Sequence, residues 1–270
     1  MPLHRTILLG VVLALAACQS VNTTQPGVVG VSRTQSMLVS SKQINDSAQK
    51  AYAQTIQQAA QKGLLNRDPS AVARVRAVAA RLIPQTAAFR PDAPGWRWEV
   101  NVISSSQINA WCMPGGKIAV YTGILDGLRL TDDELAAVMG HEIAHALREH
   151  GRERASQAMA QGVLINFVSA AAGLSGVTQD LSKLVLDLTF NLPNSREDET
   201  EADHIGVELA ARAGYDPRAS ITLWQKMAQR GGSAPPQFLS THPSSQTRAS
   251  DLREVSARVL PLYDRARQGR

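Results

Sequence analysis

Hydrophobic and polar residues alternate with a helical period along most of the chain and with a strand-like period in two short stretches. Apolar positions recur at helical spacing over residues 44–65 and 69–83. Residues 96–103 alternate as in a strand, and residues 117–122 form a second β-rich run. From residue 131 the pattern is helical almost to the end, with breaks at Gly- and Pro-containing loops. These patterns predict an α+β fold that is mainly α, with a small β-sheet.

Two further stretches, 109–116 and 162–174, predict a turn and a helix. The segment from Asn109 to Gly116 contains Pro-Gly-Gly and predicts a turn that leads into the second strand. Residues 162–174 are apolar, but Asn166 and Ser169 interrupt them and the run is too short to cross a bilayer. We therefore expect a buried core helix there rather than a membrane span.

The first 18 residues have the layout of a secretory signal, with a basic start followed by a short apolar stretch. The tetrapeptide Leu15-Ala16-Ala17-Cys18 resembles the bacterial lipobox, which predicts a signal peptide over 1–17 and acylation of Cys18, for example with palmitate. Because Gln19 rather than Asp follows, lipoprotein sorting favours the periplasmic face of the outer membrane. An ordinary cleaved signal peptide with a chance cysteine is the alternative.

Domain organisation follows from the polarity of the next segment. Residues 18–41 begin with the predicted lipid-bearing cysteine and are polar, Gly-containing and without periodicity, so they predict a flexible tether. The remaining residues, 42–270, carry no internal linker or repeat and predict a single domain.

Composition and charge exclude some classes of protein. Apolar residues make up 44% of the 270 residues and charged residues 19%, which excludes a disordered or collagen-like chain. The 28 basic and 23 acidic residues leave a net charge of +5, but no basic run exceeds two residues. A charge this diffuse does not predict nucleic-acid binding.

A metal-binding pattern follows a capping box at Thr131-Asp-Asp-Glu134, which marks a helix start. That helix carries His141-Glu142-Ile-Ala-His145, and residues four apart lie one turn apart on the same helical face. Two imidazoles in this arrangement can reach one zinc ion, while Glu142 can contact a metal-bound water. The alternative is a pair of surface histidines beside a solvated glutamate, which the apolar surroundings of the motif disfavour.

A catalytic zinc needs a third protein ligand, and the acidic stretch 195–203 offers candidates. Glu199 and Asp203 are four residues apart, so one can bind the metal while the other accepts the remaining N–H of a ligand histidine. Glu201 is expected to point away from both. Favourable charge at a helix N-terminus is the alternative explanation for these acids.

A further candidate is His242 in Thr241-His242-Pro243, with Arg248 six residues later. A loop histidine in this position is typical of an active-site contact, although a solvated loop histidine is the alternative. His150 and His204 are predicted to be structural or exposed.

Taken together, these motifs resemble metallopeptidase family 48 of clan MA, the gluzincins that include Ste-type CaaX prenyl proteases, HtpX and Oma-type enzymes. The matching segments, in order, are the NAxxxPGG segment at 109–116, the HExxH helix, the turn at 195–203 and the THPxxxxR element at 241–248. Among family members, the chain is most similar to LoiP-type periplasmic lipoprotein proteases, because it lacks spanning helices after its signal.

This resemblance implies a zincin-like fold with the sheet beside the HExxH helix and one Zn²⁺ per chain. It implies specific roles for the residues at the matching positions: zinc ligands His141, His145 and Glu199, general base Glu142, and Asp203 as partner of a ligand histidine. His242 is expected to contribute to catalysis. Arg248, Gly115 and Gly116 are expected to act in substrate binding or in the structure.

The predicted function is that of a zinc endopeptidase acting on unfolded or misassembled envelope proteins. The strand at 117–122 is expected to offer an edge on which an extended polypeptide can lie. Two alternatives remain open: a zinc-containing chaperone or assembly factor in which His242 plugs the metal, and a hydrolase of another amide such as cell-wall peptide. The expected partners are polypeptide substrates and, through acylated Cys18, a membrane.

Overall fold

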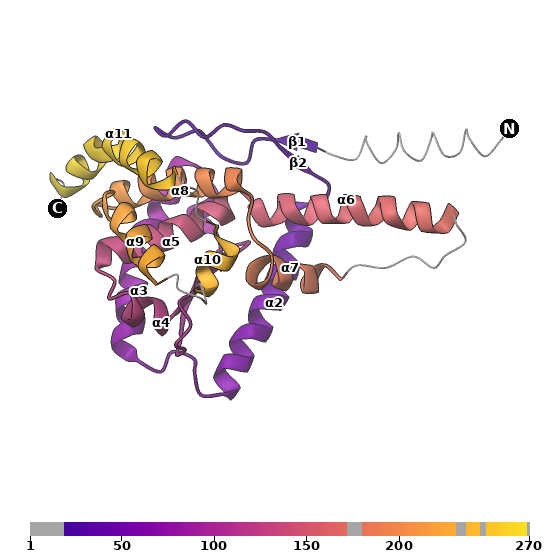
Figure 1. The fold of residues 1–270 in the computed structure, drawn as a ribbon, viewed down its shortest axis with the longest axis horizontal. Helices are drawn as coiled ribbons and strands as arrows, with labels where there is room; N and C mark the ends of the chain where they lie inside the picture. The colour runs from indigo at the N-terminus through magenta and orange to yellow at the C-terminus, as the bar shows by residue number, and fades with distance from the viewer. Residues whose placement is uncertain (1–18, 172–179, 231–235, 244–246, 269–270) are drawn as a thin grey trace.

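The computed structural model describes residues 19–171, 180–230, 236–243 and 247–268, and the side chains of residues 163–171 lie outside the description. The predicted signal peptide and Cys18 also lie outside the described residues. The elements, in chain order, are β1 (Gln19–Val21), β2 (Gln35–Met37), α2 (Ser41–Gln61), α3 (Pro69–Leu82), η1 (Ile83–Ala88), η2 (Ala93–Gly95), β3 (Glu99–Ile103), β4 (Ala110–Met113), β5 (Lys117–Tyr121), α4 (Thr122–Gly127), α5 (Asp132–Leu147), α6 (His150–Ala171), α7 (Leu181–Phe190), α8 (Arg196–Arg212), α9 (Ala219–Gln229), α10 (Gln237–Thr241) and α11 (Arg248–Gln268). The prediction of a mainly helical α+β fold is confirmed (Figure 1).

Two buried helices, α5 and α8, cross at the centre of the molecule. Every residue of α5 from Glu134 to Leu147 is buried, and the helix packs against α3, α8, α9 and β4. A Cβ atom on Gly140 would lie 2.7 Å from the carbonyl oxygen of Gly206, so the two backbones approach more closely than side chains would allow. The capping box predicted at Thr131 is present and begins α5.

The central sheet has the strand order β3-β5-β4, with β3 parallel and β4 antiparallel to β5. The expectation of a free edge at 117–122 is therefore wrong, because β3 and β4 take the hydrogen bonds on both sides of β5. The segment predicted as a turn also contains a strand, β4, which forms one edge of this sheet. The tight turn between β4 and β5 places Gly115 and Gly116 at φ 80° and 81°, and a Cβ on Gly116 would lie 2.6 Å from the Trp98 ring.

Side chains of the sheet face two hydrophobic clusters, one on each side. Val102, Ile118 and Val120 point into the larger cluster with α3, α5 and α8. Ile103 and Ala119 point into a smaller cluster that includes residues of α2 and α7. This alternation follows from the period of two in a strand and explains why Ile118, Ala119 and Val120, in the middle of β5, are all apolar.

The segment 19–39, which we call the N-terminal strap, is packed on the domain. The predicted tether is thus wrong for these residues: β1 and β2 pair with each other, and Val29 and Val31 are buried in the main core. The backbone N–H groups of Val28 and Val29 donate to Oε2 of Glu208 in α8, at 2.8 and 3.0 Å. The polar residues of this segment favoured a solvated tether in the prediction, but in the structure they form hydrogen bonds to residues of the domain. Figure 1 shows the strap passing over α8 toward α11.

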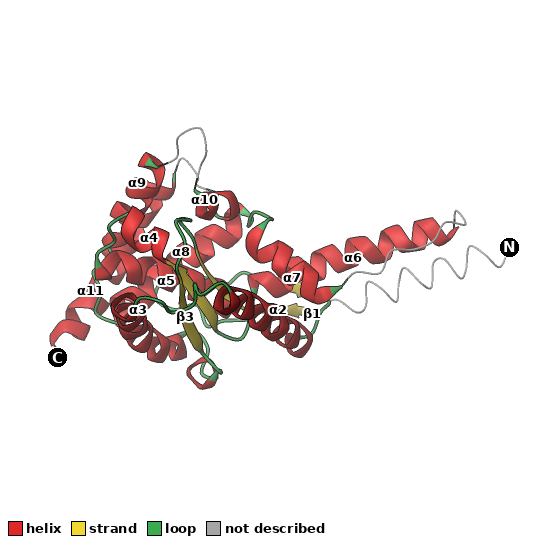
Figure 2. Ribbon diagram, turned by 90° about the horizontal axis from the view of Figure 1, so that it is seen from below, coloured by secondary structure: helices red, strands yellow, loops and turns green. Residues whose placement is uncertain are grey.

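Helix α6 runs outward from the body beside α7 (Figures 1 and 2). The predicted burial of residues 162–174 falls largely on side chains outside the description. Of the described helices, none combines the length and the apolar character that a bilayer crossing requires.

Candidate metal centre

His141 and His145 lie one turn apart on α5 and direct their Nε2 atoms toward the same point. The two Nε2 atoms are 3.1 Å apart, and both side chains are buried. This is the arrangement that the four-residue spacing predicts, and burial on all sides of α5 excludes the alternative of two surface histidines.

Helix α8 brings Glu199 to these two histidines. Its Oε2 lies 3.5 Å from His141 Nε2 and its Oε1 lies 3.3 Å from His145 Nε2. Glu199 is positioned here because α8 crosses α5 at Gly140 and Gly206, with only backbone between the two helices.

His242 follows α10 and closes the cluster from a separate segment. Its Nδ1 lies 3.2 Å from His141 Nε2 and 2.9 Å from Glu199 Oε1. The ring stacks on Phe238 with centroids 4.4 Å apart and is 5% exposed. The alternative of a solvated loop histidine is therefore excluded.

These four side chains fit a metal ion. Their donor atoms all lie within 4.8 Å of one another. Ligands about 2.0 to 2.1 Å from a tetrahedral zinc are separated from each other by about 3.3 Å. The donor atoms of His141 and Glu199 lie 2.9 to 3.5 Å from each other and from those of His145 and His242, around that value. The donor set consists of imidazole nitrogens and one carboxylate, which is chemistry that zinc accepts.

The electrostatics of the cluster also favour a cation. Burial alone would raise the pKa of Glu199, but the neighbouring His242 and His141 hold it well below its ordinary value. Burial alone would lower the pKa of His141, yet the charges of Glu199 and Asp203 raise it to about 9. A buried site in which carboxylates stabilise positive charge this strongly is suited to holding a metal ion.

Glu142 lies beside the cluster without belonging to it. Its Oε1 lies 3.4 Å from His242 Nε2 and, among the described residues, is a buried oxygen without a hydrogen-bond partner. Burial raises the pKa of this carboxyl above its ordinary value. A buried polar oxygen rarely remains unpaired in a native protein, so this atom marks a place where a polar ligand such as water belongs.

Asp203 of α8 and Arg248 of α11 form hydrogen bonds to residues of the cluster. Asp203 Oδ1 lies 2.9 Å from His141 Nδ1. Arg248 donates to the same Asp203 oxygen at 2.7 Å and to Glu199 Oε2 at 3.1 Å, while its guanidinium lies over the Trp224 ring. Arg248 thus links the two acids, and its contacts here are structural.

Comparison with known sequences identifies the family. The sequence model described as peptidase family M48 matches residues 69–256, which contain the whole cluster. The chain belongs to peptidase family M48.

Several M48 relatives share substantial identity with this chain. It is 40% identical to mitochondrial metalloendopeptidase OMA1 of Arabidopsis thaliana over 182 residues, which are 65% of this chain and 36% of the relative. It is 35% identical to human metalloendopeptidase OMA1, covering 64% of this chain and 36% of the relative. The beta-barrel assembly-enhancing protease of Escherichia coli is 29% identical, over 60% of this chain and 35% of the relative. The chain thus spans only about a third of the length of these relatives.

The M48 site contains residues that the sequence pattern did not identify. His150, predicted to be structural or exposed, and Glu201, predicted to point away from Glu199 and Asp203, are both buried and contact each other. His150 Nδ1 lies 2.8 Å from His145 Nδ1, and His150 Nε2 lies 3.0 Å from Glu201 Oε2. Helical periodicity could not predict this contact, because α5 ends at Leu147 and Glu149, at φ 52°, interrupts the helical backbone before α6 begins.

Asn194 is a further residue that sequence reasoning missed. Its side-chain amide donates to Glu199 Oε1 at 2.9 Å and lies 3.3 Å from His242 Nδ1. Arg154 donates to the side-chain oxygen Oδ1 of Asn194 at 2.6 Å. A single asparagine in a loop carries no sequence signal for this role. His204, in contrast, binds Asp251 at 2.8 Å outside the cluster.

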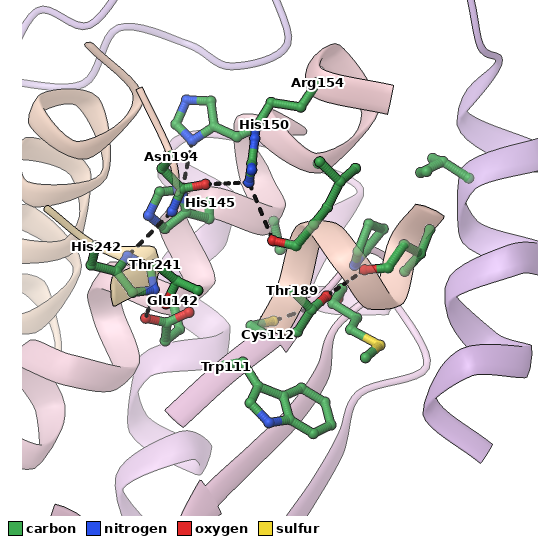
Figure 3. A pocket seen from close by; sticks show the side chains of 17 residues that line it. Trp111, Cys112, Glu142, His145, His150, Arg154, Thr189, Asn194, Thr241 and His242 are labelled. Carbon is green, nitrogen blue, oxygen red and sulfur yellow. Dashed lines mark hydrogen bonds and ion pairs between the residues drawn. The ribbon is translucent and has the colours of Figure 1, made fainter. Parts of the chain in front are cut away.

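A pocket opens beside the M48 cluster (Figure 3). His145, Glu142 and His242 form its polar end, and Figure 3 shows Trp111 and Cys112 of β4 on another side. The other walls are mainly apolar and include Ile44, Met113, Val185 and Leu188. The pocket therefore joins the edge strand of the sheet to the candidate metal centre.

Proposed function

We propose that this chain is a zinc-dependent endopeptidase that hydrolyses peptide bonds in unfolded or extended polypeptides. The observation that carries the proposal is the group of four buried donors within 4.8 Å of one another, next to an unpaired oxygen of Glu142. His141, His145 and Glu199 would hold one zinc ion per chain, and Glu142 would act as the general base.

Zinc in this site would supply Lewis-acid activation of a water molecule. Glu142 would take the proton of that water with its unpaired Oε1 and return it to the leaving amine. Its raised pKa favours the role, because a carboxylate that binds a proton more readily is a better base. Asp203 would keep the proton of His141 on Nδ1, so that Nε2 remains free to bind metal.

The edge strand β4 offers the surface on which a substrate would bind. One side of β4 pairs with β5, and β4 packs against α5, which carries Glu142. A substrate segment added to the other side would use backbone hydrogen bonds, so it must be extended rather than folded. This assignment replaces the β5 edge expected from the sequence.

We further propose that the substrates are misassembled envelope proteins and that the enzyme is held on the periplasmic side of the outer membrane by acylated Cys18. The lipobox-like sequence supports the anchor. The relative named a beta-barrel assembly-enhancing protease supports an envelope quality-control role. The assignment to the LoiP-type subgroup belongs to this same proposal.

His242 supports a second candidate function, that of a chaperone or assembly factor with little proteolysis. Its Nδ1 lies among the metal-binding donors, 2.9 Å from Glu199 Oε1 and 3.2 Å from His141 Nε2. In that position it would fill the fourth coordination site and exclude the water that hydrolysis requires. A resting enzyme that opens when substrate arrives would share this geometry.

One experiment separates the two functions. The purified full-length chain, loaded with zinc, is incubated with casein, and the products are identified by mass spectrometry beside the Glu142→Gln variant. An endopeptidase is expected to produce peptides that are absent with Glu142→Gln. Intact casein with the wild-type protein, combined with suppressed aggregation of an unfolded client, would favour the chaperone and contradict the protease.

A further inference from the structure

The two histidines of the HExxH helix are held by different partners at their second ring nitrogen. Asp203 binds His141 Nδ1 directly, at 2.9 Å. His145 Nδ1 instead lies 2.8 Å from a nitrogen, Nδ1 of His150. The other nitrogen of His150 lies 3.0 Å from Glu201 Oε2, so a carboxylate is reached only through this additional imidazole.

The positions of the protons in this chain of contacts follow from the geometry. His145 Nε2 faces the metal-binding donors, at 3.1 Å from His141 Nε2, so when it binds zinc it must present its lone pair and leave the proton on Nδ1. That proton is donated to His150 Nδ1. His150 therefore carries its own proton on Nε2 and donates it to Glu201.

Glu201 is fixed as an acceptor by two arginines. Arg148 donates to its two oxygens at 2.9 and 3.1 Å. Arg33 donates to the same two oxygens at 3.0 and 3.2 Å, and binds Glu153 with two further hydrogen bonds at 2.7 and 3.0 Å. Arg33 belongs to the N-terminal strap. Arg148 also donates to the backbone carbonyl oxygen of Arg33, at 3.0 Å.

We propose that His150 is a positioning residue for the metal centre and that the N-terminal strap supports it. In this relay, His145 is oriented by His150, His150 by Glu201, and Glu201 by Arg33 of the strap. The inference rests on the proposed zinc site. Loss of such an outer partner weakens metal binding by about 10- to 100-fold, because the ligand ring is no longer held in one orientation.

The first test compares two substitutions of similar size at His150. His150→Gln keeps one hydrogen-bond acceptor and one donor, whereas His150→Leu removes both. Zinc affinity of the full chain is measured by competition with a chromogenic chelator, together with the visible spectrum of the Co²⁺-loaded protein and the Tm of the metal-free protein. We expect His150→Leu to weaken zinc binding about 10- to 100-fold and to change the Co²⁺ spectrum. His150→Gln should stay within a few-fold of the wild type.

The second test addresses the strap. Arg33→Met is expected to weaken zinc binding, and combining it with His150→Leu should cause little additional loss, because both act through one relay. Arg81→Met is the matched control: Arg81 also anchors α8, by donating to the carbonyls of Ala213 and Gly214 at its far end. This control should change the Tm without changing zinc affinity.

The possible outcomes are distinct. Wild-type zinc affinity and an unchanged Co²⁺ spectrum in folded His150→Leu would overturn the relay. Additive losses in a folded double variant would overturn the support by the strap. If His150→Leu does not fold, the Arg33→Met variant decides alone, and wild-type zinc affinity in it would overturn that support. A wild-type chain that binds zinc no better than His141→Ala would instead refute the proposed metal centre itself.

Discussion

Gly140 of α5 and Gly206 of α8 meet backbone to backbone: a Cβ on Gly206 would lie 2.7 Å from the backbone nitrogen of His141. This contact brings α8, with Glu199 and Asp203, against the helix that carries the two histidines. The geometry of the candidate metal centre therefore depends on two glycines outside the centre, which let the helices approach because they carry no side chain.

Substitution of Gly206 should separate the two helices. Gly206→Ala is expected to destabilise the protein by about 1 to 3 kcal/mol, because backbone atoms cannot move aside as a side chain can. It should also weaken zinc binding, since Glu199 would be displaced. Thermal unfolding and chelator competition test both effects. Gly127→Ala is the control, because a Cβ there would lie 3.6 Å from Ile108, an ordinary contact. Equal stability of Gly206→Ala and wild type would contradict the role of the close approach.

Metal content and turnover should separate the ligands from the base. His141→Ala and His145→Ala should lose the single zinc, because each removes one of three protein ligands. Glu142→Gln should keep zinc and lose activity, since an amide cannot accept the proton. Elemental analysis and casein cleavage check these outcomes. Loss of metal from well-folded Glu142→Gln would show that the carboxylate is a ligand.

The two acids of α8 should differ in the size of their effect. Glu199→Ala is expected to abolish stable zinc binding, because its oxygens lie among the donor atoms. Asp203→Ala should weaken binding by about 10- to 100-fold, because Asp203 only orients His141. Chelator competition measures both. Zinc retained in Glu199→Ala would mean that another group supplies the third ligand.

His242 is expected to have two roles with opposite consequences. As a resting ligand it would restrain activity, whereas as a hydrogen-bond donor to the oxyanion it would promote activity. Removal of such a donor costs about 10²- to 10³-fold in turnover. We expect the loss to dominate, so His242→Ala should cut casein cleavage about 100-fold with zinc retained. Unchanged cleavage and metal affinity would refute both roles, and faster cleavage would leave only the plug.

Acylation can be tested independently of catalysis. Labelled palmitate is expected to enter the wild-type protein in bacterial cells, while Cys18→Ser should remain unlabelled and appear as a soluble or unprocessed form. Fractionation of the membranes provides the second measurement. Mature wild-type protein in the soluble fraction would contradict the lipid anchor.

Features that depend only on residues close together along the chain could be predicted from the sequence. The helix start at Thr131 and the shared face of His141 and His145 follow from capping chemistry and helical geometry alone. The pairing of Glu199 with this helix was inferred from the order of motifs, and α8 does bring Glu199 there. The mainly helical α+β class likewise followed from periodicity.

Other features were decided only by packing between distant segments. The sequence of the N-terminal strap predicted a tether because its residues are polar. The pattern of polar residues does not show that Arg33 binds Glu153 of α6 and Glu201 of α8. The position of β5 at the centre of the sheet depends on which strands pair, and a strand's sequence does not specify its neighbours. His150 reaches His145 because the positive φ of Glu149 interrupts the helix between them, which breaks the periodicity on which the prediction relied. Local chemistry thus determined the helix that carries two of the four metal-binding donors. Tertiary packing supplied the other two and the support behind them, because those contacts join atoms that are close in space but far apart along the chain.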